Sequence, residues 1–359
     1  MLERLTLTQY RNYGHEVLDL APGVNLIVGP NAQGKTNLLE AIYLLSTGKI
    51  LRGMKDQEAI MDRHEEFLVV GMIQPGSTEI KVSVAKGHHK KAFLNEVKLA
   101  RTADLLGRLP SVIFSNLDLE IVRGDASNRR LFLDLELSQI YPGYLKALAG
   151  YKRALEQRNA LCKAQEGRLS PYGLSEIWDQ QLAEFGTKLR EYRKAFAHDL
   201  NETGLEIQEE LAGGEKFELT YLQKEEADNL AQALQDNWSQ DVRRGTTSVG
   251  PHRDDVLIQV ENREVRLFGS QGQQRTAGIS LKLATMRQVL KKLGIPPIVL
   301  LDDVLSELDE SRRRHLLEWL ESVQAQTVLT CTEAEQAGKK IMGNSRIFGV
   351  QCGTVKLIQ

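Results

Sequence analysis

The residues whose types and spacing most clearly indicate a chemical role lie near the amino terminus, in a segment that matches GxxxxGK[ST] in full. An apolar run, residues 24–28, precedes this segment, and a helix-like apolar pattern follows it. Backbone N–H groups of such a loop and the positive end of the next helix can surround phosphate oxygens. The alternative is a glycine-rich turn that binds nothing. The residues assigned to the phosphate loop are Gly29, Pro30, Asn31, Ala32, Gln33, Gly34, Lys35 and Thr36.

This pattern predicts the binding of ATP with Mg²⁺. Lys35 is expected to reach the β and γ phosphates, and the Thr36 hydroxyl to ligate the metal. A second metal ligand is expected from Asp302, which follows the apolar run 298–301 as a Walker B aspartate would. The adjacent Asp303 could orient the attacking water or accept its proton. An acidic pair in this position could also simply cap the following helix.

Two further segments could complete a nucleotide site. Ser270, Gln271 and Gly272 precede a helical run and resemble the ABC-type signature loop, whose serine and glycine contact a γ-phosphate bound to the opposite subunit. Read alone, the same segment could be a flexible polar loop. Segment 306–309, ending in Asp309, resembles the D-loop that crosses the dimer interface of such proteins.

The elements that must position these residues are of mixed α/β type. Strands are expected near residues 5–7 and 24–28, followed by a helix carrying Leu38, Leu39, Ile42 and Leu45. Residues 67–99 alternate between apolar and polar and predict an antiparallel β section. Later strands are predicted at residues 256–260, 298–301 and 327–330.

A helical hairpin separates the two strand-bearing parts of the chain. Its arms are expected at about 145–166 and 176–212, with glycines and a proline between them. The second arm carries apolar residues at steps of four and three, which fit either an ordinary core helix or a coiled coil. These residues are Trp178, Leu182, Phe185, Leu189, Tyr192 and Phe196. We therefore predict one domain from residues 1–145 and 246–359, and an inserted helical domain at 146–245.

The composition bounds the cellular setting. The 359 residues include 42% hydrophobic residues and carry a formal net charge of −2, which gives no bulk electrostatic reason to bind nucleic acid. Three widely spaced cysteines exclude a disulfide framework and fit a reducing compartment. No apolar stretch is long enough to span a membrane, so a cytoplasmic location is expected.

Taken together and in this order, the motifs resemble those of the RecF family in the SMC and ABC-ATPase superfamily. The resemblance covers nearly the whole chain, and the short insert of about 100 residues separates it from SMC proteins with their much longer coiled coils. The matching segments are LTLTQYRNY, GPNAQGKTNLLEAIYLLS, FSNLDLEIVRGDASNRRLFLD, VGPHRDDV, GSQGQQRT and LLDDVLSELD.

The resemblance implies an ABC-type, SMC-like P-loop ATPase head built from both chain ends, with an inserted helical arm. It implies that two molecules enclose two ATP molecules, with Lys35, Thr36 and Asp302 from one subunit and Ser270 and Gly272 from the other. Slow, DNA-stimulated hydrolysis would then switch DNA binding. The implied partners are a second copy of the chain, gapped or single-strand to double-strand junction DNA, RecR and RecO, and indirectly RecA, which is loaded onto the DNA.

Some positions depart from the pattern of ABC enzymes. Thr332 lies where a histidine usually contacts the γ-phosphate, and Asp303 lies where many relatives carry glutamate, so hydrolysis is expected to be weak. No clear Q-loop is present, and residues 114–118 are the best candidate. The run His252 to Asp254 has the letters of a kinase catalytic loop but lacks its partner motifs, so a structural or nucleotide-facing turn is expected.

Basic clusters are candidates for DNA contact, although a charged run is usually only a solvated face. They are His88, His89, Lys90 and Lys91; Arg129 and Arg130; Lys152, Arg153 and Arg158; and Arg243 and Arg244. Two other classes of protein remain open at this point. A P-loop phosphotransferase would have no use for the signature and D-loop segments, and a nucleotide-dependent scaffold would bind partners without useful turnover.

Overall fold

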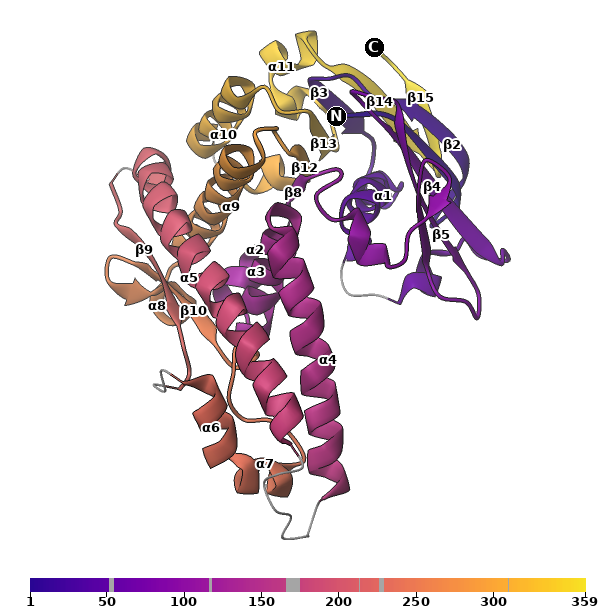
Figure 1. Ribbon diagram of the computed structural model, residues 1–359. Coiled ribbons are helices and arrows are strands. Elements are labelled where there is room, and N and C mark those ends of the chain that lie inside the picture. The colour runs from indigo at the N-terminus through magenta and orange to yellow at the C-terminus, as the bar shows by residue number, and fades with distance from the viewer. Residues whose placement is uncertain (52–54, 116–117, 166–174, 213, 226–228, 309) are drawn as a thin grey trace. The chain divides into compact units, whose positions relative to one another are not determined.

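The computed structural model describes residues 1–51, 55–115, 118–165, 175–212, 214–225, 229–308 and 310–359 (Figure 1). The chain forms two compact units. The first contains Met1–Asp118 and Thr285–Gln359, so it is built from both chain ends, and the second contains Leu119–Ala284.

The first unit has a mainly parallel sheet in the order β15-β14-β3-β13-β12-β8. Its members are β3 (Val24–Val28), β8 (Ser111–Phe114), β12 (Ile298–Asp302), β13 (Thr327–Cys331), β14 (Arg346–Gln351) and β15 (Thr354–Leu357). Only β15 runs antiparallel to its neighbour. Residues 298–301 of β12 are apolar and all buried, as expected for a parallel strand that is covered on both faces.

A second, antiparallel sheet in this unit has the order β2-β1-β4-β5-β6-β7. Its strands are β1 (Leu2–Tyr10), β2 (Tyr13–Asp19), β4 (Glu66–Ile73), β5 (Thr78–Ala85), β6 (Lys91–Leu94) and β7 (Val97–Lys98). In β4, buried and more exposed residues alternate, which is the pattern of a sheet with one buried face. One core joins side chains from both sheets to those of α1 (Lys35–Thr47).

The first unit also contains the last part of α9 (Gln271–Leu293) and several shorter helices. They are α10 (Glu310–Val323), α11 (Lys339–Gly343) and the 3-10 helices η2 (Asp56–Ala59), η3 (Thr102–Leu105), η5 (Val304–Glu307) and η6 (Ala334–Ala337).

The second unit holds the predicted helical hairpin, formed by α4 (Pro142–Ala164) and α5 (Glu176–Ala212). Along α5, Leu182, Leu189 and Phe196 are fully buried, whereas Phe185 and Tyr192 are only partly buried. The predicted apolar seam is therefore divided between a closed core row and a more open row. The predicted break between the arms at 167–173 lies outside the described residues.

The inserted unit also contains elements on both sides of this hairpin. They are α2 (Asp118–Arg123), α3 (Ala126–Ile140), β9 (Phe217–Leu222), α6 (Leu230–Asp236), α7 (Trp238–Arg244), β10 (Asp255–Val260), β11 (Arg263–Glu264), α8 (Val265–Phe268) and the first part of α9 (Gln271–Leu293). Because α3 packs on α4 and β10 pairs with β9, the compact unit is larger than the predicted 146–245 insert. Among the described residues, no helix combines the length and apolarity needed to cross a membrane.

A buried arginine ties the hairpin to the helices that follow it. Arg158 of α4 is fully buried and donates to Asp179 (Nε to Oδ1, 2.5 Å) and to Asp241 (Nη1 to Oδ2, 2.6 Å). Its other donors reach the Thr247 hydroxyl at 3.0 Å and the Leu234 carbonyl at 3.0 Å. Each charge has a partner, and removal of one would leave the others buried and unpaired.

Arg158→Leu should therefore destabilise the protein by about 3 to 5 kcal/mol, because it leaves the Asp179 and Asp241 carboxylates buried without their cation. Urea unfolding followed by circular dichroism measures this change. Arg153→Leu, at an exposed position of the same helix, is the control and should change stability by less than about 0.5 kcal/mol. Equal unfolding midpoints for the two variants would show that the buried network contributes nothing particular.

Candidate functional site

The phosphate loop links β3 to α1, and two of its glycines lie where a Cβ atom would clash with neighbouring residues. A Cβ atom on Gly29 would lie 2.3 Å from the carbonyl oxygen of Val350 in the neighbouring strand. Gly34 has φ of 115°, which side chains rarely adopt, and a Cβ there would meet Asn12 and Tyr13. The loop is therefore packed closely between neighbouring turns, with the amino terminus of α1 at its end.

Lys35 is folded back onto the loop. Its ammonium group donates to the carbonyl oxygens of Gly29 (2.6 Å) and Pro30 (2.9 Å), and the residue is 7% exposed. A phosphate at the loop would offer this charge a stronger, anionic acceptor.

The loop is also held from outside by two residues that the sequence analysis did not single out. Asn12 donates to the Gln33 carbonyl at 2.9 Å, and the Tyr13 hydroxyl donates to the Gly34 carbonyl at 2.9 Å. Asn12 in turn accepts from Asn37 of α1 at 2.8 Å. Their only sequence signal is their place in the segment LTLTQYRNY, which gives no hint of these contacts.

The predicted metal ligands meet where the start of α1 lies beside the carboxyl end of β12. The Thr36 hydroxyl donates to Asp302 Oδ1 at 2.9 Å, which joins the two ends of the chain. Thr330 of β13, another residue with no predicted role, also donates to Asp302 Oδ1, at 3.0 Å. A hydroxyl and a carboxylate are hard oxygen donors, so this pair suits Mg²⁺.

Thr330 also contacts the backbone of Asp303. Its backbone N–H donates to Thr330 Oγ1 at 2.9 Å, and its φ of 54° is unusual for a residue other than glycine. Thr330 thus orients both the predicted metal ligand and the backbone of the predicted base.

Thr332 follows β13, which lies between β3 and β12, so it emerges at the same edge of the sheet as the phosphate loop. Its hydroxyl accepts a hydrogen bond from Gln336 at 2.8 Å. Of the candidate Q-loop at 114–118, Ser115 and Asp118 are described and bond to each other. Residues 116–117 and the predicted D-loop residue Asp309 lie outside the described residues.

The predicted signature residues belong to the second unit. Ser270 is exposed directly before α9, and Gln271 and Gly272 begin that helix. The Ser270 Oγ accepts from the Gln273 backbone N–H (3.2 Å), while Gln273 Oε1 accepts from the Ser270 N–H (3.0 Å). This reciprocal pair is a capping box, so the segment is an ordered helix start and not a flexible loop.

The run from His252 to Asp255 is held by hydrogen bonds to other residues of the second unit, with Asp254 buried and its neighbours partly buried. Asp254 is fully buried and accepts two hydrogen bonds from Arg190, while Asp255 accepts two from Arg129. Burial lowers the pKa of His252 to about 4, so its ring is neutral at pH 7. These contacts are internal and favour the structural of the two predicted roles.

Some residues of the basic clusters are buried and so cannot contact DNA. Arg129 and Arg158 are 4% and 0% exposed and are used in internal ion pairs, so their predicted availability to phosphates is wrong. The side chains of His88, His89, Lys91, Arg153, Arg243 and Arg244 remain exposed.

The chain is similar to known proteins over nearly its whole length. A model of the RecF/RecN/SMC N terminal domain matches residues 1–356. Two curated relatives named DNA replication and repair protein RecF, from Clostridium acetobutylicum and Geobacillus thermodenitrificans, are 37% and 36% identical. Each alignment covers 99% of this chain, and 99% and 98% of the respective relative.

The chain belongs to the RecF family. The solved structure of the recombination mediator protein RecF-ATP in the RecFOR pathway matches with a TM-score of 0.90 and 33% identity, over 100% of this chain and 99% of that chain. An Smc head domain from Pyrococcus furiosus matches with a TM-score of 0.58 at 16% identity, covering 99% and 95%, and so shares the fold. The predicted fold, an ABC-type head resembling that of SMC proteins, is confirmed.

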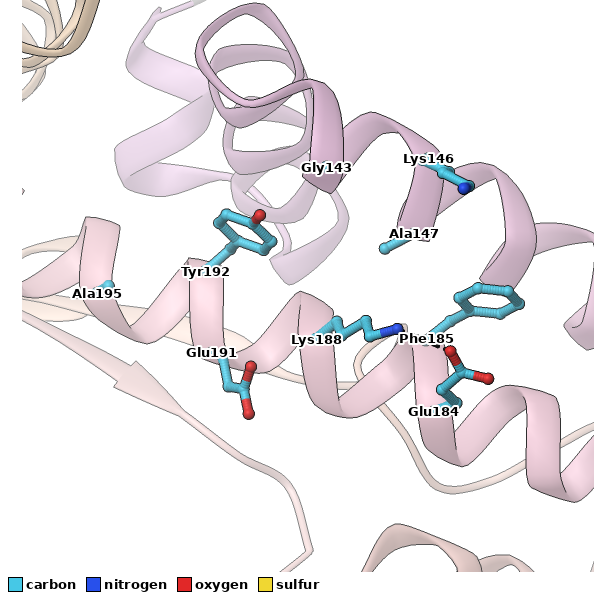
Figure 2. Close-up of a pocket in the computed structure, with 9 residues that line it drawn as sticks. All are labelled: Gly143, Lys146, Ala147, Glu184, Phe185, Lys188, Glu191, Tyr192 and Ala195. Atoms are coloured by element: carbon cyan, nitrogen blue, oxygen red, sulfur yellow. Dashed lines mark hydrogen bonds and ion pairs between the residues drawn. The ribbon is translucent and has the colours of Figure 1, made fainter.

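A cavity of about 750 Å³ lies between α4 and α5 of this RecF-family chain (Figure 2). Phe185 and Tyr192 project from α5 toward α4, and Lys188 is paired with Glu184 at 2.7 Å. Volume alone would make this cavity a ligand site. The phosphate loop with its paired Thr36 and Asp302 is the better candidate, because it alone of the two has the groups that bind a nucleotide and a metal.

Thr330→Val should weaken the metal site, because Asp302 loses the hydroxyl that orients it. We expect the Kd for ATP measured with Mg²⁺ to rise about tenfold, and the Kd measured in EDTA to change less than about twofold. Thr327→Val, at the other end of the same buried strand, is the control and should leave both constants near those of wild type. An equal loss with and without Mg²⁺ would contradict a role for Thr330 at the metal.

Proposed function

We propose that this protein is an ATP-dependent DNA-binding recombination mediator whose ATP-bound form is a dimer. The observation that carries the proposal is the 2.9 Å hydrogen bond between Thr36 and Asp302. It supports a P-loop joined to a Walker B aspartate, which is the minimum arrangement for binding a nucleotide with Mg²⁺. The solved relatives named RecF-ATP and RecF-ATPrS agree with ATP as the nucleotide.

In the proposed reaction, the loop N–H groups and the start of α1 hold the phosphates of ATP. Lys35 would exchange the carbonyls of Gly29 and Pro30 for phosphate oxygens, and Thr36 and Asp302 would hold Mg²⁺. The metal, when bound, neutralises charge on the β and γ phosphates. Asp303 would orient the attacking water. Its side chain is one methylene group shorter than the glutamate of many ABC enzymes, which fits weak turnover. Thr332 takes the place of their γ-phosphate histidine.

The second half of each site is proposed to come from another copy of the chain. Ser270 is exposed at the start of α9, where N–H groups and the helix dipole favour an anion. Leu267 and Phe268, just before it, are 60% and 68% exposed. Apolar side chains of this size on a surface favour burial against a partner. ATP would then join Lys35, Thr36 and Asp302 of one subunit to Ser270 and Gly272 of the other, with Asp309 at the interface.

The DNA function is proposed from the family and from the exposed cations. Two curated relatives are named DNA replication and repair proteins, and the solved relatives are recombination mediators of the RecFOR pathway. Gapped or junction DNA, RecR and RecO are accordingly the proposed partners, with RecA loading as the result. Slow, DNA-stimulated hydrolysis would remove the bridging γ-phosphate and release the dimer.

Sedimentation velocity with Mg-ATP, with and without gapped DNA, tests the dimer. Wild type is expected to sediment as a dimer. Lys35→Met should remain a monomer because it loses its phosphate contacts. Ser270→Arg should bind ATP with near wild-type affinity and still remain a monomer, because its phosphate loop is intact but its signature surface is blocked. Wild type that stays monomeric with saturating ATP and DNA would refute the proposal.

A further inference from the structure

The hydrogen bonds that fix Ser270 continue beyond the capping box into the body of the inserted unit. Gln273 Nε2 donates to Glu215 Oε1 at 3.0 Å. Glu215 lies just before β9, and its other oxygen, Oε2, accepts from Gln208 Nε2 of α5 at 3.5 Å. Gln208 Oε1 in turn accepts from the Ser280 hydroxyl of α9 at 2.7 Å. The relay therefore begins at the exposed Ser270 and ends at a pair, Gln208 and Ser280, that is fully buried.

The chemistry at position 215 sets the direction of this relay. An ionised carboxylate only accepts hydrogen bonds, so both groups that face Glu215 must present donors. The Gln273 amide is thereby held with its nitrogen toward Glu215 and its oxygen toward the Ser270 N–H. A flipped amide would place two acceptors against each other at Glu215 and would lose the bond to Ser270.

We propose that Gln273 and Glu215 are positioning residues for Ser270, and that this relay preorganises the signature loop for the ATP held by a second copy of the chain. The inference rests on the proposed dimer and adds to it the residues that prepare its second half. An exposed serine would otherwise lose side-chain freedom on association, and an ordered helix start has lost that freedom in advance.

Three variants separate the cap from its support. Glu215→Ala keeps the capping box but removes the acceptor for Gln273. Gln273→Glu also keeps a capping box, since glutamate serves at this position, but it turns a carboxylate toward Glu215. In the double variant Gln273→Glu with Glu215→Gln, the amide and the carboxylate exchange places, so a donor again faces an acceptor. Glu210→Ala, at an exposed position of α5, is the control.

The measured quantity is the protein concentration at half-dimerisation in saturating Mg-ATP, from sedimentation velocity. We expect it to rise about tenfold for Glu215→Ala and for Gln273→Glu, to return near wild type in the double variant, and to be unchanged for Glu210→Ala. The Kd of monomeric protein for ATP should stay the same in all variants, because the phosphate loop belongs to the first unit. Thermal unfolding of each variant checks that the fold is retained.

The outcomes distinguish this inference from the function on which it rests. Wild type that fails to dimerise refutes the proposed function and the inference together. Wild type that dimerises, while Glu215→Ala dimerises at the same concentration, refutes the inference alone. A double variant no better than Gln273→Glu also refutes it, because the paired exchange restores only the relay.

Discussion

The hydrogen bond between Thr36 and Asp302 is the constraint on which the ATP site depends. It requires a helix from the amino-terminal part of the chain to start beside the end of a strand from the carboxyl-terminal part, so that Thr36 Oγ1 and Asp302 Oδ1 lie 2.9 Å apart. The parallel order β3-β13-β12 meets this requirement because neighbouring parallel strands end at one edge of the sheet. A chain in which the two ends folded as separate domains could not form this pair. The second unit can therefore be inserted between these two parts of the sequence only because strands from both parts pair in one sheet.

Thr330 shows how much of such a site lies outside its motifs. It stands on β13 between the two motif-bearing strands and contacts Asp302 through its side chain and Asp303 through that residue's backbone N–H. Asn12, in the turn after β1, and Tyr13, at the start of β2, donate hydrogen bonds to backbone carbonyls of the phosphate loop. These residues fix the backbone of the motif segments and the side chain of Asp302, so residues outside the motifs help to set the geometry of the site.

The sequence was informative where a local pattern has a single physical solution. The phosphate loop, the buried strand at 298–301 and the hairpin helices were predicted because their glycines, apolar runs and helical spacing act over short distances. The supports at Asn12, Tyr13 and Thr330 could not be predicted, because their partners depend on strand order. The same holds for Arg129 and Arg158, which the sequence analysis named as candidates for DNA contact because of their charge. Their burial against Asp255, Asp179 and Asp241 follows from packing between segments that are distant along the chain.

The central claim is that each ATP site is shared between two chains, and mixing two inactive variants tests it most directly. Lys35→Met lacks a working phosphate loop, and Ser270→Arg lacks a working signature, so each alone should show almost no ATPase activity. A mixed dimer regains one complete site, from the loop of one variant and the signature of the other. Because neither variant is expected to pair with itself, the dimers in an equal mixture should be mixed dimers, and the recovered rate should reach at most about half of the wild-type rate, since each carries one of two sites. A mixture no more active than the sum of its separate parts would contradict a shared site.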